Sequence, residues 1–136
     1  MVDEIAVTLW PVERIPDEDC LYFRVHKGFM DRDGKPIPGA FRNRPGEGDE
    51  TGGMSTDWCR YSTAEESRSR GRVPTDNAVI KLIAGQVREI PEQSVEHSPD
   101  SSRNNRAHTD VWGEKTAEVR IQFLRIYSTV IPLQSR

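Results

Sequence analysis

Apolar residues occur in a few short runs in this chain, and long polar stretches separate the runs. The clearest runs are residues 20–26 (CLYFRVH), 54–58 (MSTDW) and 78–84 (AVIKLIA). Their β-branched and aromatic residues favour strands, because such side chains pack well on a pleated surface. The pattern predicts a small core built on strands, with long polar loops between them.

The length of the chain sets the number of domains. A chain of 136 residues has the size of one ordinary domain and is too short for two well-cored ones. The hydrophobic content of 35% is low, but its clustering argues against a disordered chain. We therefore expect residues 1–136 to form a single domain.

Two helices are predicted beside the strands. Ser62 and Glu65 fit a capping box that starts a short helix over residues 63–70, which Gly71 ends. This helix is polar nearly all round, so it belongs on the surface. The segment 114–133 has both helical and alternating spacing of its apolar residues, and we favour a helix over 115–128 followed by an extended tail. The expected fold is α+β, with a mostly antiparallel sheet, one short surface helix and one C-terminal helix.

Turns and loops are expected between these elements. Residues 31–36 (DRDGKP) have turn composition, and Gly85 should interrupt the apolar run before a further piece at 87–90. Residues 5–12 are a further expected strand. Residues 42–53 contain four glycines and no apolar side chain, so mobile loops are predicted near 42–53 and 99–106.

Charge and cysteine content exclude some classes of function. The net charge of −3 argues against nucleic acid as a partner, since proteins that bind it by charge usually carry a basic excess. The sequence has no apolar run long enough for a membrane span, and no signal peptide is visible. We expect Cys20 and Cys59 to be small buried residues in a reducing compartment, and the protein to be cytoplasmic.

Residues able to bind or react are concentrated in the segment 94–113. It contains His97 and His108, with Asp110 two residues further on. If residues on either side of the loop 100–106 pair as a hairpin, these side chains and His26 would come together. Three such ligands with an open position are typical of catalytic zinc. The spacing matches no known metal motif, so no metal site and no cofactor are predicted.

The sequence also contains residues for two other chemistries, nucleophilic catalysis and anion binding. Ser55, Cys59 and Ser98 can each be paired with a histidine, but no GxSxG motif marks a nucleophile. Arginines in the polar loops and on the surface helix could form an anion-binding rim. We favour a solvated surface for them, because acidic residues are interspersed. These arginines are Arg42, Arg44, Arg68, Arg70, Arg72, Arg103 and Arg106.

The order of several short segments resembles a group of small uncharacterised bacterial proteins. The segments are LYFRVH at 21–26, AF at 40–41, MSTDW at 54–58, VREI at 87–90, EHSPD at 96–100 and RAHTDVWG at 106–113. The likeness covers most of the chain and implies that some of its polar residues belong to a family pattern. Those residues are Arg24, His26, Ser55, Asp57, His97, Pro99 and His108.

A looser likeness concerns ADP-ribosyltransferase-like folds. LYFRVH and GMSTDW resemble, in order, the first two pieces that surround the dinucleotide in those folds. The third piece in those folds is a glutamate late in the chain. It has no clear counterpart here, and Glu96 and Glu118 are only nominal candidates. This resemblance implies nucleotide binding through Arg24, His26, Ser55 and His108.

These observations give two hypotheses of different class. The first is a binding or interaction module of a bacterial multigene system with a protein partner, because no complete catalytic set is visible. The alternative is a small nucleotide- or dinucleotide-binding enzyme that uses Arg24, His26, Ser55 and His108. The candidate binding residues for both are Arg24, His26, Ser55, Asp57, His97, His108 and Asp110.

Overall fold

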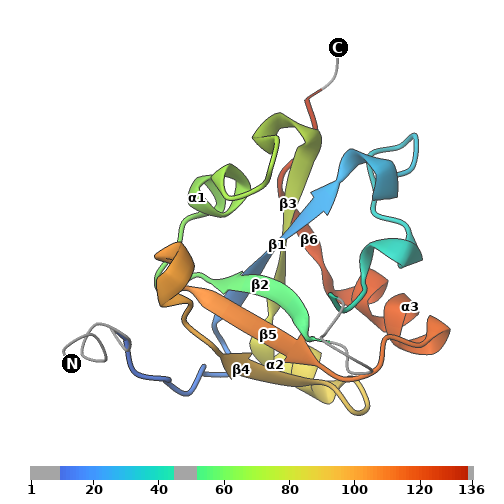
Figure 1. The fold of residues 1–136 in the computed structure, drawn as a ribbon. Helices are drawn as coiled ribbons and strands as arrows, with labels where there is room; N and C mark the ends of the chain where they lie inside the picture. The colour runs from blue at the N-terminus through green and yellow to red at the C-terminus, as the bar shows by residue number, and fades with distance from the viewer. Residues whose placement is uncertain (1–9, 45–51, 135–136) are drawn as a thin grey trace.

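The structure, a computed structural model, describes residues 10–44 and 52–134. Within these ranges the chain forms one six-stranded antiparallel sheet with three α-helices, so the predicted α+β fold is confirmed (Figure 1). In sheet order the strands are β4 (Ser94–His97), β5 (His108–Trp112), β2 (Met54–Trp58), β1 (Cys20–His26), β3 (Asn77–Ile83) and β6 (Ser128–Ile131). The helices are α1 (Ala64–Ser69), α2 (Ala84–Glu89) and α3 (Ala117–Ile126).

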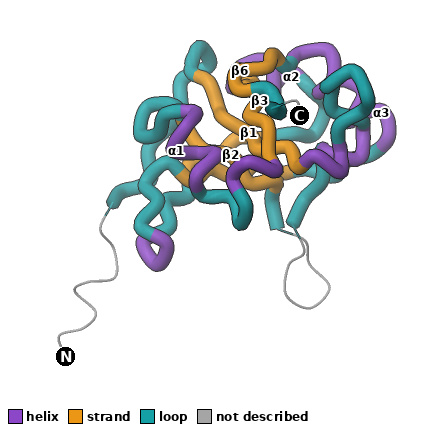
Figure 2. The backbone as a smooth tube through the Cα atoms, turned by 90° about the horizontal axis from the view of Figure 1, so that it is seen from above, coloured by secondary structure: helices purple, strands orange, loops and turns teal. Residues whose placement is uncertain are grey.

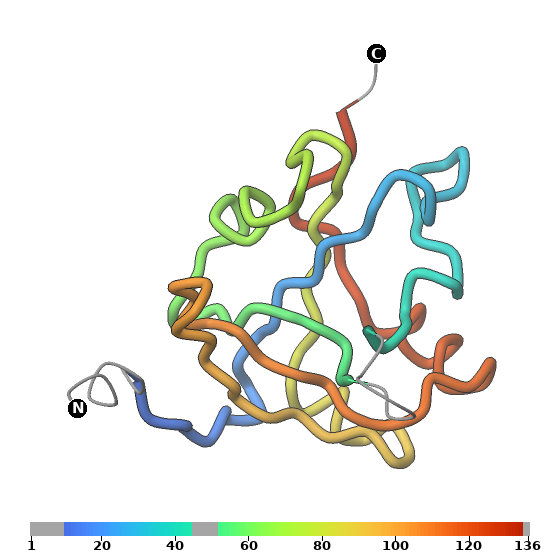
Figure 3. Tube along the Cα trace, viewed as in Figure 1, coloured from blue at the N-terminus to red at the C-terminus, as the bar shows by residue number. Residues whose placement is uncertain are grey.

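β1 lies in the middle of the sheet, between β2 and β3, although it comes first in the chain (Figure 3). Its apolar residues Leu21, Phe23 and Val25 are buried, and the residues between them face the other side. Successive side chains of a strand point to opposite faces, so this alternation gives the sheet an apolar face and a polar face.

The apolar face carries the core. Phe41 stacks between Phe23 and Phe123 of α3, with ring centroids 5.7 and 5.1 Å apart. Val87 of α2 belongs to the same buried cluster. α2 and α3 therefore cover the apolar face, whereas α1 lies apart from them on the other side of the strands (Figure 2). No helix in the two described ranges has the length and apolar content needed to cross a membrane.

Most predicted elements are present. The strands expected at 20–26, 54–58 and 78–84 are β1, β2 and β3, and the helix expected over 115–128 is α3. The extended tail pairs with β3 as β6. The expected strand 5–12 lies mainly outside the described residues, and residues 10–12 are not in a strand.

The expected loops are only partly described. Residues 45–51 of the loop 42–53 lie outside the described ranges. The loop 99–106 is closed by backbone hydrogen bonds between Asp100 and Asn105, both 2.9 Å long.

The start of α1 differs from the prediction by one residue. Thr63, not Ser62, is the N-cap: its hydroxyl accepts from the Glu66 amide at 3.0 Å, and the Glu66 carboxylate accepts from the Thr63 amide at 2.9 Å. The sequence offers both frames, Ser62 with Glu65 and Thr63 with Glu66. The observed frame places Ser67 inward, where its hydroxyl donates to Asp57.

Residues 84–89 form helix α2 rather than an interrupted strand. Ala84 and Val87, three residues apart, both face the core, which is helical spacing. Gly85 allows a close approach, since a Cβ there would lie 2.8 Å from the Cβ of Asp17. The two cysteines are free, and they are less buried than expected, because both are partly exposed.

Candidate functional site

The polar face of the sheet brings most of the predicted site residues together. In the ladder between β2 and β5, Ser55 lies opposite Asp110 and Asp57 lies opposite His108. Residues on alternate positions share a face, so these four side chains lie on one side. Arg24 of β1 reaches Asp57 at 3.3 Å on that side, and His26 follows Arg24 by two residues.

His97 lies on the opposite face. It pairs with Thr109 rather than His108, so the hairpin is formed as expected but the two histidines do not converge. His97 Nδ1 accepts from the Glu13 amide at 3.0 Å, and its Nε2 lies 2.7 Å from the Arg106 carbonyl. Its ring packs edge-on against Trp58. His97 is therefore a buried structural residue, and the expectation that it shares a site with His108 is wrong.

Asp57 accepts hydrogen bonds from four side chains on the polar face. Its Oδ2 accepts from Arg24 at 3.3 Å, from Arg70 at 2.9 Å and from the Ser67 hydroxyl at 2.7 Å. Its Oδ1 accepts from the Asn105 amide at 2.9 Å. The carboxylate thus connects β1, α1 and the β4–β5 hairpin, and it fixes two guanidinium groups side by side.

The surroundings of Asp57 keep it ionised. Burial acts to raise the pKa of this carboxyl, but hydrogen bonds from Asn105 and Ser67 and the charges of Arg70 and Arg24 outweigh burial. The net result is a pKa below the usual range. For Arg24, burial disfavours the charged form and lowers the pKa, although the negative charge of Asp57 acts to raise it.

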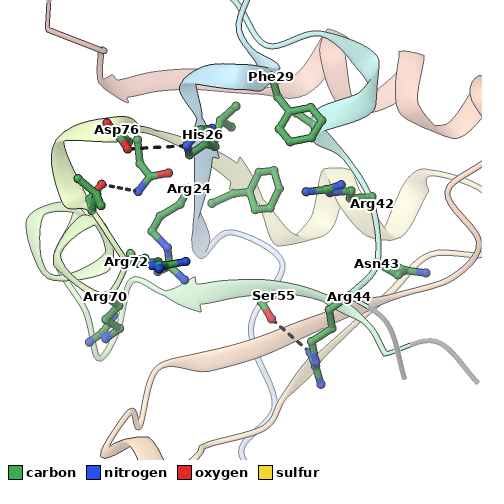
Figure 4. A pocket seen from close by; sticks show the side chains of 16 residues that line it. Arg24, His26, Phe29, Arg42, Asn43, Arg44, Ser55, Arg70, Arg72 and Asp76 are labelled. Atoms are coloured by element: carbon green, nitrogen blue, oxygen red, sulfur yellow. Dashed lines mark hydrogen bonds and ion pairs between the residues drawn. The ribbon is translucent and has the colours of Figure 1, made fainter. Parts of the chain in front are cut away.

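A cleft of about 940 Å³ opens beside this ion pair, and five arginines line it (Figure 4). They come from β1, from the segment after η3 (Pro38–Ala40) and from the turn after α1. They are Arg24, Arg42, Arg44, Arg70 and Arg72. Two carboxylates, Asp57 and Asp110, hold three of these side chains, so positive charge is in excess at the cleft.

Two glycines position the arginines. A Cβ at Gly71 would lie 2.4 Å from Asn77 Nδ2, so a larger residue in the turn 70–72 would displace the Asn77 side chain. A Cβ at Gly53 would lie 2.8 Å from the Cβ of Asp110. Backbone hydrogen bonds then join Arg44 to Gly52 and Gly53, and its guanidinium reaches Asp110 Oδ1 at 2.7 Å.

The far end of the cleft is aromatic and mixed in charge. Arg42 lies over the ring of Phe29, 4.4 Å from its centroid. His26 Nδ1 accepts from the Gly28 amide at 3.0 Å, so the proton of the neutral ring lies on Nε2. Nε2 faces Asp76 at 3.9 Å, and Lys27 pairs with the same carboxylate at 3.2 Å.

A smaller recess of about 300 Å³ adjoins the cleft. Arg24, Ser55 and Arg70 line both spaces. His108 lines the recess but not the cleft. Ser55 is therefore accessible from either side. Its Oγ lies 3.3 Å from His108 Nε2 and 3.2 Å from Arg44 Nη1.

Sequence reasoning missed the arginines as site residues. Four of those assigned to a solvated surface, Arg42, Arg44, Arg70 and Arg72, line the cleft. A signal was present, because each arginine lies within a few residues of a glycine or a strand end. Arg106 differs, since it lies over Tyr61 near His97. Within residues 10–44 and 52–134, no three His, Cys, Asp or Glu side chains are arranged to hold a metal ion.

Comparisons with known proteins add no relative to this geometry. The chain matches no protein-family model, no curated protein and no solved structure.

Proposed function

We propose that the protein binds a small phosphate-bearing ligand, with nucleotides as the expected class, in the arginine-lined cleft. The observation that carries the proposal is that five arginines line one concave site. Guanidinium is planar and matches the geometry of phosphate oxygens, and Arg is the residue most used for such recognition.

The charges at the cleft support an anionic ligand. The chain as a whole carries a net charge of −3, whereas the cleft has an excess of arginine. Arg42 has the Phe29 ring rather than a carboxylate as its neighbour. Arg72 forms no hydrogen bond or ion pair with any residue in the described ranges, so both can meet a ligand.

The size and lining of the cleft support a molecule rather than a lone ion. A volume of about 940 Å³ is within the range of small-molecule sites. Phe29, Asn43 and His26 provide an apolar surface and hydrogen-bonding groups next to the arginines. Nucleotides combine a flat ring with phosphates, which fits this lining.

This proposal favours the nucleotide hypothesis over the interaction module. The module with a protein partner was inferred because the sequence carries no catalytic set, and it stays a prediction. The arginine cleft is a specific feature that an unspecified partner does not require.

The test is a thermal-shift and calorimetric titration of the whole chain. The ligands are inorganic phosphate, pyrophosphate, AMP, ADP, ATP and NAD, with potassium chloride added to equal ionic strength. Ligands that bind only the folded state stabilise it, by about 2.7 kcal/mol at a concentration 100 times the Kd. We expect pyrophosphate and nucleotides to stabilise the protein more than phosphate does.

Variants locate the binding. Arg42→Gln and Arg72→Gln should each weaken binding about tenfold, which is the value of one charge-assisted hydrogen bond. Arg125→Gln is the matched control, since Arg125 is exposed on α3 and does not line the cleft. The proposal fails if none of these ligands stabilises the wild type, or if both cleft variants bind as the control does.

A further inference from the structure

Ser55 and His108 form a hydrogen-bonded pair at the wall between the cleft and the recess. The serine Oγ lies 3.3 Å from His108 Nε2. Ser55 is on β2 and His108 is on the neighbouring β5, and both side chains are on the polar face. A hydroxyl within hydrogen-bond reach of an imidazole is the arrangement that activates a serine nucleophile.

The contacts of His108 set its tautomer. Its Nδ1 lies 2.9 Å from the backbone carbonyl oxygen of Ser98. A carbonyl can only accept, so Nδ1 carries the proton of the neutral ring. Ser98 Oγ, 3.0 Å from the same Nδ1, uses its own hydrogen to donate to Asp110 at 2.8 Å and so accepts from the ring. Nε2 is then left with a free lone pair that points at Ser55.

Arg44 completes the arrangement. Its Nη1 donates to Ser55 Oγ at 3.2 Å and to Asp110 Oδ1 at 2.7 Å. The serine oxygen thus accepts from Arg44, and its hydrogen is available to His108. The guanidinium charge also favours negative charge on Oγ as the proton leaves.

We propose that Ser55 is a nucleophile and His108 its general base in the hydrolysis of a phosphate ester held by Arg24 and Arg70. This inference rests on the proposed binding of a phosphate-bearing ligand. Arg24 and Arg70 line both spaces that meet at Ser55, and Asp57 fixes their positions. Such preorganised positive groups stabilise the charge of a phosphoryl group in transfer.

The reaction has two steps. In the first, Ser55 Oγ forms a bond to phosphorus while the bond from phosphorus to the ester oxygen breaks. His108 Nε2 takes the serine proton and gives it to the departing alcohol. In the second, water attacks the phosphoserine, His108 accepts a proton from the water, and that proton returns to Ser55 as the Oγ–P bond breaks. One ester and one water give one alcohol and one phosphate.

The first test needs no knowledge of the natural substrate. An alkyl fluorophosphonate phosphonylates activated serines: the serine oxygen forms a bond to phosphorus as fluoride leaves, so the reagent reports the nucleophile directly. We expect the whole wild-type chain to be labelled once, at Ser55, as located by peptide mass spectrometry. Pyrophosphate should slow the labelling, because it occupies the arginines next to Ser55. Release of phosphate from p-nitrophenyl phosphate is measured in parallel.

Three variants separate the roles. Ser55→Ala should remove labelling, and His108→Gln should slow it about 100-fold or more, the usual contribution of a general base. Ser94→Ala is the control, since Ser94 is an exposed serine at the other end of the β4–β5 hairpin. Circular dichroism and the melting temperature show whether each variant is folded.

The outcomes distinguish this inference from the binding proposal. If pyrophosphate stabilises both the wild type and Ser55→Ala, but no serine is labelled and no p-nitrophenyl phosphate is hydrolysed, the nucleophile is refuted and binding stands. Labelling at another serine, or labelling that is unchanged in His108→Gln, refutes it as well. If Ser55 is labelled but pyrophosphate neither binds nor protects, the phosphate-ester substrate class falls together with the proposed function.

Discussion

Asp57 shows how one buried carboxylate shapes the cleft. It accepts hydrogen bonds from Arg24, Arg70, Ser67 and Asn105, and its side chain is only 4% exposed. Removing one member of a buried charge cluster leaves the other charges uncompensated, which usually costs more than the cluster contributed. Asp57 thus acts on any ligand through the two arginines that it positions.

Replacing this carboxylate gives the first prediction. Asp57→Asn should lower the free energy of unfolding by about 3 kcal/mol at neutral pH, because Arg24 and Arg70 lose their shared counter-charge. The pKa of Asp57 is lowered in the folded protein, so its contribution is complete above the unfolded value of about 3.9 and is lost as the pH falls through the folded value. The difference between wild type and variant should therefore shrink in acid.

Urea denaturation of both proteins from neutral pH down to about pH 3 measures this difference. Asp33→Asn is the control, since Asp33 is an exposed turn residue. A difference that stays constant across the range would contradict the assigned role of Asp57.

At this scale the sequence indicated the polar residues of β1, β2 and β5 but not the arginines of the loops. Ser55 with Asp57, and Arg24 with His26, alternate along their strands, so each pair could be placed on one face from the sequence. His97 could not be placed, because a register shift of one residue in the β4–β5 hairpin moves it to the other face. The loop between these strands is long, and nothing in its sequence fixes the register.

Among the elements, the connection from β5 to α3 depends on Gly113. This residue has φ +119°, and a Cβ there would lie 2.2 Å from the Glu92 carbonyl oxygen. Gly113→Ala must therefore move the backbone of the β5–α3 connection or of the turn before β4. We expect it to lower the free energy of unfolding by more than about 2 kcal/mol.

Gly34 supplies a matched comparison. It has φ +80°, but no atom would lie within 4 Å of an added Cβ. Gly34→Ala should cost only about 1 kcal/mol, the cost of the positive φ alone. Chemical denaturation of the two variants separates the clash from the conformational cost, and equal losses would show that the close approach to Glu92 is relieved without penalty.

The predicted elements differ from the structure where the local sequence fits two alternatives equally well. A capping box is present, but it lies one residue later than predicted. The sequence allows both frames, because Ser62 is followed by Thr63 and Glu65 by Glu66. α2 was missed because Gly85 and the isoleucine-rich run before it indicate the end of a strand and not the start of a helix. The packing of Val87 against the core decides between these solutions, and this is a tertiary effect.

For the whole molecule, the sequence predicted the fold class but not the cleft. Short β-branched runs and two helical segments were sufficient to indicate an α+β fold. The cleft requires β1, the segment around Arg42 and the turn around Arg72 to meet, and these parts are far apart in the chain. No local pattern encodes that meeting, so the arginines resembled a solvated surface until the topology was known.

The stability of the whole molecule should depend on pH in the alkaline range through three groups. Burial lowers the pKa of Lys115 to about 8, although its Nζ donates to Asn43, Val111 and Gly113. Burial, together with the neighbouring Cys59 thiol, raises the pKa of Cys20 to about 12. Burial and the adjacent Cys20 raise the pKa of Tyr22 to about 12.

The signs of these shifts are opposite. Between pH 8 and 10.5 the unfolded chain binds the Lys115 proton more tightly than the folded protein does, so stability rises with pH. From pH 9.0 for Cys20 and 10.0 for Tyr22, up to about 12, the folded protein holds the proton more tightly and stability falls. Only Lys115 acts between pH 8 and 9 among these three groups.

We therefore expect the free energy of unfolding to rise from pH 8 to 9, to level off as the thiol titrates, and to fall towards pH 12. The rise is at most about 1.4 kcal/mol per pH unit, the value for one proton. Urea denaturation under a reducing agent, which keeps Cys20 and Cys59 as thiols, measures the profile. Lys115→Met should remove the rise even though its overall stability is lower, since three carbonyls lose a donor, and Tyr22→Phe should reduce the fall. A rise that persists in Lys115→Met would show that Lys115 is not its source.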